Sequence, residues 1–263
     1  GHYVNDFQDI RVPPNTHLLR MVPKRFGPAI RRREAAFAAE TEKMAEHYRR
    51  FCGIEPIVFP HVVRIRDNVI LARRDKLPEE RAPVFATYGF TRHDKGTDIF
   101  QAAIKRFLEA RPEIKIEFIV QWTGDFETDG QLATRDPELE AHPKVTYLDR
   151  FDASEDYEKY LARTDLAVLP YRKYFYYARL SRVAIDAAIC GIPAVYPRET
   201  WLEDFFTRNG RGLGFTHEDA GDLARAMGEA YDKLAELRRE ARGNRIATRH
   251  FYSPENFIDS LLD

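Results

Sequence analysis

The chain has 263 residues, of which 44% are hydrophobic, 32% charged and 13% aromatic, a composition typical of a globular protein with a substantial buried core. Its 41 Lys and Arg residues against 42 Asp and Glu residues leave a net charge of −1. No global field therefore draws the protein to nucleic acid or to anionic lipid, and any anion site must be local.

The sequence contains no apolar run long enough for a membrane-spanning helix and no recognisable signal peptide, so we expect a cytoplasmic protein. Its cysteines, Cys52 and Cys190, stand far apart and outside any metal-ligand spacing. We expect both to be reduced, partly buried apolar residues, and we expect no metal site.

The first part of the chain predicts few regular elements. Residues 1–24 carry three prolines and predict a meandering segment, whereas residues 27–52 have apolar side chains every three or four positions and predict one amphipathic helix ending near Gly53. Residues 57–65 are β-branched but contain Pro60, which indicates a strand or sheet edge. A charged connector follows, where we expect a domain boundary.

From Ala82 onward, short apolar runs alternate with amphipathic helices. This alternation predicts an α/β fold, a Rossmann-like parallel sheet with helices on both faces. Pro112, Ser154 and Gly191 provide helix boundaries. Near the end of the chain we expect a helix that breaks at Gly243 and a last helix capped by Ser253.

The loop after the first strand of this sheet offers an anion site. Ligands of open α/β sheets bind at the carboxyl ends of the strands. Here Gly89 lets the backbone approach a ligand, Arg92 offers a planar fork and Lys95 a point charge at the mouth of the next helix. The set suits a diphosphate. The alternative is a solvated loop that binds nothing.

A second loop, residues 170–181, leads into a helix that Ser181 can cap. Alanines on that helix allow close packing on the sheet, which would hold its N-terminus at the strand ends as an anion site. Asp186 lies on the second turn of this helix. Its carboxylate either reaches the ribose hydroxyls of a bound ligand or is exposed to solvent. The tyrosines of the loop either line a sugar or base pocket or pack beside the sheet; they are Tyr174, Tyr176 and Tyr177.

Together the two loops resemble the nucleotide-sugar-binding half of the retaining GT-B glycosyltransferases, the family called glycosyl transferases group one or family four. The resemblance covers roughly residues 82 to 240. Residues 89–96 are close to the variant motif G-x-x-R-x-x-K-G, whose basic side chains hold the donor diphosphate in the family. A later motif has two acidic residues eight apart. The second is Asp186 here, and the first, which contacts the donor sugar in the family, is Ala178.

The resemblance implies a retaining glycosyltransferase that transfers a sugar from a nucleotide-diphosphate sugar, without a metal or other cofactor. Arg92 and Lys95 would be its catalytic residues, because they stabilise the leaving diphosphate electrostatically. Asp186 would bind the ribose. The implied donor-binding residues are Gly89, Arg92, Lys95, Tyr177, Ser181, Arg182, Val183 and Asp186.

The implied acceptor is a saccharide or a lipid-linked saccharide, as in polysaccharide biosynthesis, and no nucleic acid partner is expected. Arg31, Arg32 and Arg33 predict a basic helical face. This face either contacts a lipid-linked acceptor at the inner face of the membrane or is simply exposed to solvent. The cluster Gly210-x-Gly212-x-Gly214 opens no helix, so we interpret it as a turn and not as a dinucleotide site.

The size of the chain leaves two hypotheses open. About 80 residues precede Ala82, too few for a second Rossmann-like domain, and we therefore expect a fragment of a longer enzyme. The alternative is a catalytically inactive Rossmann-like binding or assembly module. The expected parts are a reduced N-terminal segment (1–65), a linker (66–81), the nucleotide-sugar-binding domain (82–245) and a C-terminal crossing helix (246–263).

Overall fold

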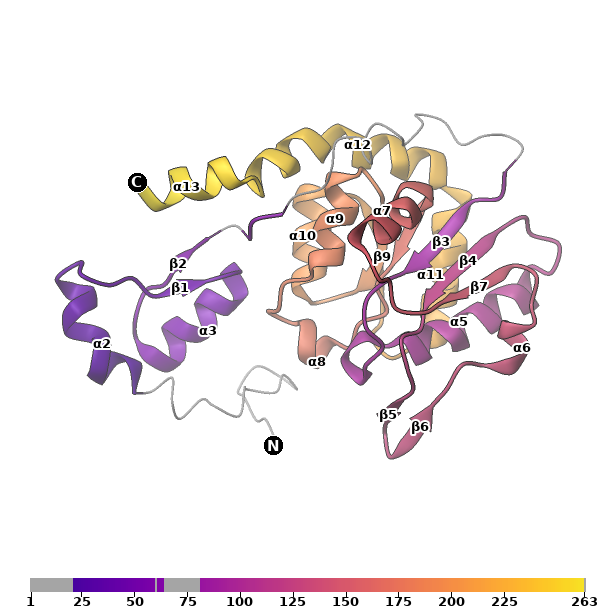
Figure 1. The fold of residues 1–263 in the computed structure, drawn as a ribbon, viewed down its shortest axis with the longest axis horizontal. Coiled ribbons are helices and arrows are strands. Elements are labelled where there is room, and N and C mark those ends of the chain that lie inside the picture. Colours follow the sequence, from indigo (N-terminus) through magenta and orange to yellow (C-terminus); the bar gives the residue numbers. More distant parts are fainter. Residues whose placement is uncertain (1–20, 60, 64–80, 263) are drawn as a thin grey trace.

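The computed structural model describes residues 21–59, 61–63 and 81–262. Figure 1 shows a large α/β unit on one side and a smaller unit, built from the first elements, on the other. The C-terminal helices run along the large unit and end beside the smaller one.

The large unit is built on a six-stranded sheet in which every neighbouring pair is parallel, in the order β10-β9-β8-β3-β4-β7. The strand order reverses between β3 and β8, and such a reversal opens a crevice at the carboxyl ends of those two strands. The Rossmann-like α/β fold predicted from the sequence is therefore confirmed. The strands are β3 (Val84–Thr87), β4 (Glu117–Gln121), β7 (Val145–Leu148), β8 (Leu166–Val168), β9 (Ala194–Pro197) and β10 (Gly212–Phe215).

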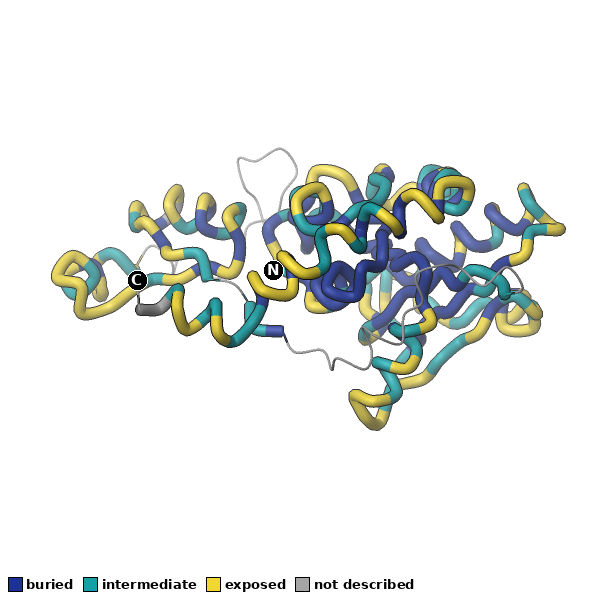
Figure 2. The backbone as a smooth tube through the Cα atoms, turned by 90° about the horizontal axis from the view of Figure 1, so that it is seen from above, coloured by how far each residue is buried: buried dark blue, intermediate teal, exposed yellow. Residues whose placement is uncertain are grey.

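Helices cover both faces of the sheet and enclose one apolar core on each. The core on one face includes Phe107 and Met227, and the core on the other includes Ala187 and Phe206, all almost fully buried. Figure 2 shows this dark blue interior within the large unit. The helices are α5 (Thr97–Ala110), α6 (Pro137–Glu140), α7 (Ser154–Arg163), α8 (Lys173–Tyr176), α9 (Arg182–Ile189), α10 (Trp201–Asn209), α11 (Ala220–Asp232), α12 (Leu234–Phe251) and α13 (Pro254–Leu262).

Several predicted boundaries are confirmed. Pro112 follows the end of α5, Ser154 is the first residue of α7, and Gly191, with a φ of 63°, follows α9. The Ser253 Oγ accepts a hydrogen bond from the Asn256 amide at the start of α13. Local capping chemistry therefore sets these ends in the folded chain as the sequence indicates.

The prediction of one helix over residues 27–52 is wrong. Two helices, α2 (Val22–Arg31) and α3 (Glu42–Cys52), flank a short strand β1 (Ala38–Ala39). The Thr41 hydroxyl caps α3 by accepting a bond from the Met44 amide, and β1 pairs in parallel with β2 (Ile57–Val58). Capping and strand pairing outweigh the helix propensity of this alanine-rich stretch. Residues 1–20 of the predicted meandering segment lie outside the described residues.

The basic helix expected around residues 31–33 is also not formed as predicted. Of the three consecutive arginines, Arg31 ends α2, whereas Arg32 and Arg33 follow the helix, and Arg33 has a φ of 60°. Arg32 forms two hydrogen bonds to the Glu34 carboxylate in an exposed ion pair. The three side chains are therefore not a continuous basic helical face.

Two glycine-based predictions are also wrong. Helix α12 continues through Gly243, and the chain bends instead at Lys233, between α11 and α12. Buried contacts on both sides of Gly243, from Arg238 and Thr248, outweigh the roughly 1 kcal/mol that an internal glycine costs a helix. The cluster around Gly212 is the edge strand β10 and not a turn; a Cβ there would lie 1.9 Å from the Ala194 carbonyl oxygen, so only glycine permits the pairing.

The buried carboxylate of Asp165 holds together the large unit at the end of the sheet where β3 and β8 begin. Asp165, directly before β8, accepts hydrogen bonds from the Arg81 guanidinium, from the Val84 amide at the start of β3 and from Arg238 on α12. The side chain is 1% exposed. One acidic residue therefore joins Arg81, where the chain enters the large unit, to the central strands β3 and β8 and to the long helix α12.

The smaller unit contacts the large unit at several points. The Thr41 hydroxyl donates to the Ala178 carbonyl oxygen at 2.6 Å, and Lys43 forms an ion pair with Asp204. The Val63 amide donates to the Tyr252 carbonyl oxygen. These contacts place α3 beside the loop between α8 and α9. Both cysteines are buried and unbridged, as expected for reduced residues.

Candidate functional site

The loop after β3 lies against the loop after β8, at the point where the strand order reverses. The β3 loop ends in a short 3₁₀ turn, η1 (His93–Lys95), followed by Gly96 with a φ of 61°. A Cβ on Gly96 would lie 1.9 Å from the Pro170 carbonyl oxygen. Both the left-handed backbone and the close approach therefore require glycine at this position.

Arg172 holds these loops together from within. Its guanidinium donates to the carboxylates of Asp98 and Glu218 and to the His93 carbonyl oxygen, and its backbone amide donates to the Asp94 carbonyl oxygen. The side chain is 3% exposed. A buried, fully paired arginine of this kind fixes the η1 turn relative to α8.

Lys95 lies in an aromatic cage. Its Nζ atom lies 3.9 Å from the centre of the Tyr171 ring and 5.0 Å from that of Tyr176. Gly89, whose φ is 117°, lies next to this ammonium: a Cβ added there would lie 3.9 Å from the same Nζ atom, at ordinary contact distance. Burial lowers the pKa of Lys95, while hydrogen bonding to Tyr176 opposes that shift. The two rings leave the ammonium only partly exposed to water, which strengthens its attraction for an anion.

Arg92 does not stand free in this structure. Its Nε and Nη2 atoms donate to the two oxygens of Asp94 at 2.9 and 3.0 Å. Arg179, from the loop before α9, donates to the same carboxylate at 3.1 Å. The predicted diphosphate-binding arginine is therefore paired with an acidic neighbour in the same loop.

The N-terminus of α9 lies beside the Lys95 cage. The Ser181 hydroxyl accepts a bond from the Ala184 amide, which makes it the N-cap that the sequence indicates. Its Oγ also lies 3.4 Å from the Tyr171 hydroxyl. Tyr171 thus connects Lys95 to the start of α9, and the structure brings together Gly89, Lys95 and Ser181 as predicted.

A cavity of about 300 Å³ opens beside this cluster, over the carboxyl ends of β3, β4 and β7. Gly89, Arg182, Val183 and Asp186 line it, so four of the predicted donor-binding residues share one cavity. The remaining lining residues are Tyr88, Phe90, Gln121, Thr123, Arg150, Phe151 and Tyr157.

Asp186 is a buried carboxylate, 2% exposed, and not the solvated side chain of the alternative reading. It accepts hydrogen bonds from the Tyr157 hydroxyl at 3.0 Å and from Arg182 Nε at 2.7 Å. Burial raises the pKa of Asp186, and the Arg182 charge and both hydrogen bonds oppose that shift. Each carboxylate oxygen has a second lone pair, so the group can still accept a bond from a ligand hydroxyl.

Tyr177 lies apart from this cavity, contrary to the prediction. Its ring faces α3, where the Lys43 ammonium lies 4.9 Å from the ring centre and the His47 ring at 6.0 Å. Tyr174 packs against His217, and Tyr176 against Tyr171. Successive residues of a helical turn point about 100° apart, so consecutive tyrosines on and after α8 cannot share one pocket.

The sequence interpretation did not identify most of the aromatic and polar lining. Gln121 is the last residue of β4 and Thr123 follows that strand, and Arg150 and Phe151 follow β7, so all four lie at the carboxyl end of a strand. The Gln121 side chain accepts a bond from the Gly89 amide and so aligns the β3 loop. The signal that could have found these residues is their position directly after predicted parallel strands.

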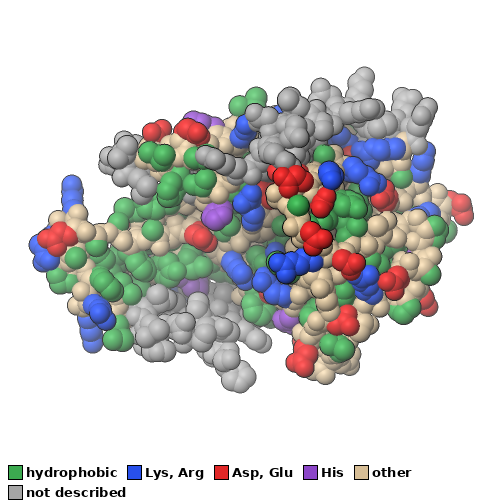
Figure 3. Space-filling view, viewed as in Figure 1, with side chains coloured by type: hydrophobic (Ala, Val, Ile, Leu, Met, Phe, Trp, Pro, Cys, Tyr) green, Lys and Arg blue, Asp and Glu red, His purple; other side chains and the backbone are tan. Residues whose placement is uncertain are grey.

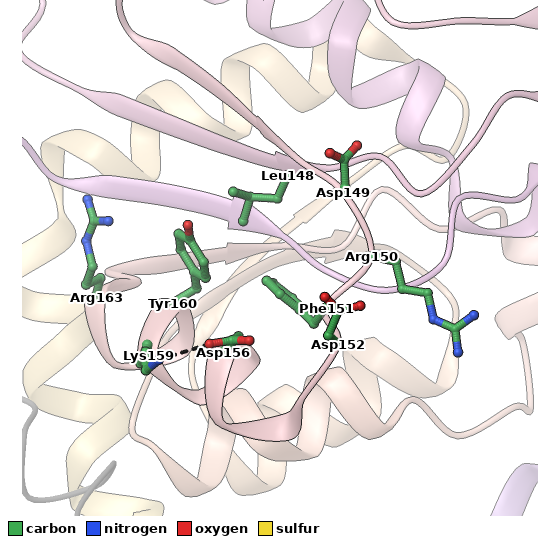
Figure 4. A pocket seen from close by; sticks show the side chains of 9 residues that line it. All are labelled: Leu148, Asp149, Arg150, Phe151, Asp152, Asp156, Lys159, Tyr160 and Arg163. Atoms are coloured by element: carbon green, nitrogen blue, oxygen red, sulfur yellow. Dashed lines mark hydrogen bonds and ion pairs between the residues drawn. The ribbon is translucent and has the colours of Figure 1, made fainter.

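A second hollow, of about 490 Å³, lies between the loop after β7 and α7. Figure 4 shows its lining, with Tyr160 and Phe151 between the two elements and the Lys159 ammonium paired with Asp156. The Arg150 side chain points away from this hollow in that view. Because Arg150 and Phe151 also line the first cavity, the loop after β7 forms a wall between the two hollows.

Residues 21–59, 61–63 and 81–262 contain neither a metal-binding group of side chains nor a membrane-spanning helix. Within these ranges no group of three or more His, Cys, Asp or Glu side chains is arranged to hold a metal ion. The helices in the same part of the chain also include none that is both long and apolar enough to cross a membrane.

A sequence profile of the family described as glycosyl transferases group 1 matches residues 82–233, more than half of the chain. The chain belongs to the group 1 glycosyltransferases. The matched region of the chain contains β3 to β10 and every residue of the cavity described above. No curated protein matches the sequence significantly.

Solved structures of similar fold include sucrose-phosphate synthase from Thermosynechococcus elongatus (18% identity, TM-score 0.62, covering 86% of this chain and 55% of that one). TarM from S. aureus, in complex with fondaparinux, alpha-GlcNAc-glycerol and UDP, has 15% identity and a TM-score of 0.66, covering 99% and 48%. HepE from Anabaena, in complex with UDP and glucose, has 14% identity and a TM-score of 0.60, covering 86% and 61%. The chain thus spans about half the length of these proteins, and at such identities the likeness shows the Rossmann-like α/β fold alone.

Proposed function

We propose that this glycosyltransferase chain binds the nucleotide-diphosphate sugar donor of a retaining enzyme, which transfers the sugar to a saccharide or lipid-linked acceptor. The observation that carries the proposal is the cavity at the strand ends, where the buried carboxylate of Asp186 and the backbone of Gly89 face one space. The caged ammonium of Lys95 lies directly beside it. A buried carboxylate and a partly buried cation a short way apart suit a ligand with hydroxyls at one end and phosphates at the other.

The nucleoside fits the cavity itself. Asp186 would accept a hydrogen bond from a ribose hydroxyl, with Arg182 and Tyr157 fixing its orientation. Flat apolar side chains around the cavity, Phe90 and Phe151 among them, offer faces on which a base can stack. The family motif and the UDP held by TarM and HepE support a nucleoside diphosphate as the occupant.

The diphosphate would lie between the cavity and α9. Lys95, Arg92 and the positive end of the α9 dipole would meet the negative charge that grows on the leaving diphosphate as the sugar bond breaks. Fixed charges at that point stabilise the transition state more than the ground state, and this chemistry needs no metal ion. The reaction would proceed with retention, as in the family that the motifs resemble.

A second candidate, a binding or assembly module without activity, is favoured by one observation. Ala178 stands where the family motif has its first acidic residue, and its backbone carbonyl is already occupied by the Thr41 hydroxyl. A chain that binds nucleotide but never turns over a donor would fit this function. Prolonged incubation with nucleotide sugars tests this candidate, because even slow release of nucleoside diphosphate would contradict a module without activity.

The test of the main proposal is calorimetric titration with UDP, GDP, CDP and ADP. We expect one of them to bind, and Asp186→Asn to weaken it by about 1–3 kcal/mol because the ribose loses a charged acceptor. Asp232→Asn, an exposed carboxylate paired with Arg111, is the matched control and should bind as the wild type does. Failure of all four nucleotides to bind, or equal affinity of the two variants, would contradict the proposed placement.

A further inference from the structure

One carboxylate in the β3 loop is shared by two guanidinium groups. Arg92 donates two hydrogen bonds to Asp94 and Arg179 donates a third, at distances of 2.9 to 3.1 Å. The Asp94 side chain is 10% exposed, whereas those of Arg92 and Arg179 are 49% and 50% exposed. The acid therefore lies beneath two arginines that reach the surface.

Lys95 and Arg179 lie on the same aromatic side chain. The Lys95 Nζ atom lies 5.0 Å from the centre of the Tyr176 ring, and the Arg179 Cζ atom 5.4 Å from it. Three cations, Arg92, Lys95 and Arg179, thus gather around one ring and one carboxylate. The charge of Asp94 balances only one of them, which leaves an excess of about two positive charges. Figure 3 shows Lys and Arg side chains grouped in the middle of this face of the molecule.

We propose that Arg179 is a third cationic residue of the diphosphate site, and that Asp94 takes the place of the phosphates while no donor is bound. The inference rests on the proposed function and deepens it. A phosphate group presents paired oxygens to a guanidinium much as a carboxylate does. Each arginine can therefore exchange its bonds to Asp94 for bonds to phosphate with little movement.

The exchange has two consequences for the enzyme. While the site is empty, Asp94 holds both guanidiniums in place, so less side-chain entropy is lost when the donor binds. When the site is occupied, Asp94 competes with the phosphates for the same donors, which weakens the hold on the nucleoside diphosphate product. The competition acts on charge-assisted hydrogen bonds and outweighs the side-chain entropy saved, so the net effect of Asp94 is to lower affinity and favour product release.

Pyrophosphate, UDP and uridine are the probes, measured by calorimetry on the full chain. We expect Arg179→Ala to weaken pyrophosphate and UDP by about tenfold to a hundredfold and to leave uridine unchanged, because uridine lacks the phosphates. Arg179→Lys should recover part of the loss, since it keeps the charge but not the fork. Asp94→Asn should tighten pyrophosphate and UDP several-fold. In the double variant Asp94→Asn/Arg179→Ala the part of that gain that comes from Arg179 should disappear, and the part that comes from Arg92 should remain.

Arg225→Ala is the matched control, because Arg225 is also half-exposed and paired with carboxylates but lies on α11. An unchanged pyrophosphate affinity in Arg179→Ala would overturn the role of Arg179, even where UDP binds. Weaker binding in Asp94→Asn would overturn the competing role of Asp94. Pyrophosphate binding that depends on Arg179, in a chain that binds no nucleotide, would support this inference and contradict the proposed function. Binding of none of the probes would overturn both.

Discussion

The Lys95 ammonium lies 3.9 Å from the centre of the Tyr171 ring, and the hydroxyl of that tyrosine lies 3.4 Å from the capping hydroxyl of Ser181. A residue of the first strand-end loop and the start of a helix more than 80 positions later are thus joined by one aromatic side chain. The predicted diphosphate site depends on this connection.

Replacing Lys95 with Met should weaken nucleoside diphosphate binding by about 1–3 kcal/mol, because a charge-assisted bond to phosphate is lost while the apolar stem is kept. Arg92→Ala should do the same. The control is Lys105→Met, a surface lysine on α5 that pairs with Asp136. Calorimetry on the three variants measures the effect. Wild-type affinity in both Lys95→Met and Arg92→Ala would show that the phosphates lie elsewhere.

The affinity for nucleoside diphosphate should also fall as the pH rises. Burial lowers the pKa of Lys95, so its ammonium loses its proton at a lower pH than an ordinary lysine, whose pKa is 10.5. Above the lowered value the anion loses its caged cation. Titrations at increasing alkaline pH should show this decline in the wild type and not in Lys95→Met. Parallel curves for the two proteins would exclude Lys95 as its source.

The same pKa shift predicts the sign of a stability change. Between the lowered pKa of folded Lys95 and the ordinary value, the unfolded chain binds more protons than the folded one, so the contribution of Lys95 to stability rises with pH across that window. Denaturant unfolding without ligand should show a smaller rise in Lys95→Met. An opposite slope would mean that a charged partner, and not burial, dominates.

Gly96→Ala should both destabilise the protein and weaken nucleotide binding. The added Cβ would meet the Pro170 carbonyl oxygen at 1.9 Å and would force the two strand-end loops apart. Gly130→Ala is the matched control, because Gly130 also has a positive φ, of 78°, but a Cβ there meets no atom within 4 Å. We expect a loss of about 1 kcal/mol for the control and about 1–3 kcal/mol more for Gly96→Ala. Equal losses in denaturant unfolding would mean that the loops adapt.

Arg172→Met should cost about 3–5 kcal/mol of unfolding free energy, because it leaves the partly buried carboxylates of Asp98 and Glu218 without their shared cation. An arginine in an exposed pair is worth far less, so Arg225→Met should stay within about 0.5 kcal/mol of the wild type. Urea unfolding of both variants gives the comparison. Similar stability of the two variants would show that the loops are held by other contacts.

The chain alone should transfer sugar poorly, even where it binds donor. Holding donor and acceptor in register supplies up to roughly 7–11 kcal/mol of the barrier reduction, and this chain spans only about half the length of the similar solved structures. The measurement is turnover with several nucleotide sugars and acceptors, compared with a full-length relative that contains both halves. Transfer at the same rate would show that the smaller unit suffices as an acceptor site.

The large unit could be predicted from sequence because its signals are local and repeated. Alternating short apolar runs and capped helices give the strand and helix order, and Gly89, Lys95 and Ser181 follow because each stands directly after a strand or before a helix. The smaller unit could not, since the break between α2 and α3 depends on the pairing of β1 with β2. Such pairing joins residues that the helical pattern of residues 27–52 does not relate.

The pairing of charged side chains in the site also could not be predicted from sequence patterns. Nothing in the order of residues indicates that Asp94 pairs with Arg92 and, across 85 positions, with Arg179. Likewise, the orientation of Tyr177 towards α3 depends on the smaller unit, which contributes Lys43 to that contact. Distant pairings of this kind arise only once the sheet brings its loop ends together.

The carboxylate of Asp165 couples movements of the smaller unit to the central strands of the large unit. It binds Arg81, where the chain enters that unit, and Arg238, on the helix that returns to the smaller unit. A force that pulls the smaller unit away along α12 would reach this one side chain and, through it, β3 and β8, which start beside it. The opposite ends of those strands carry Gly89 and Tyr171. Rocking of the smaller unit would therefore strain the two strands from which the donor crevice opens.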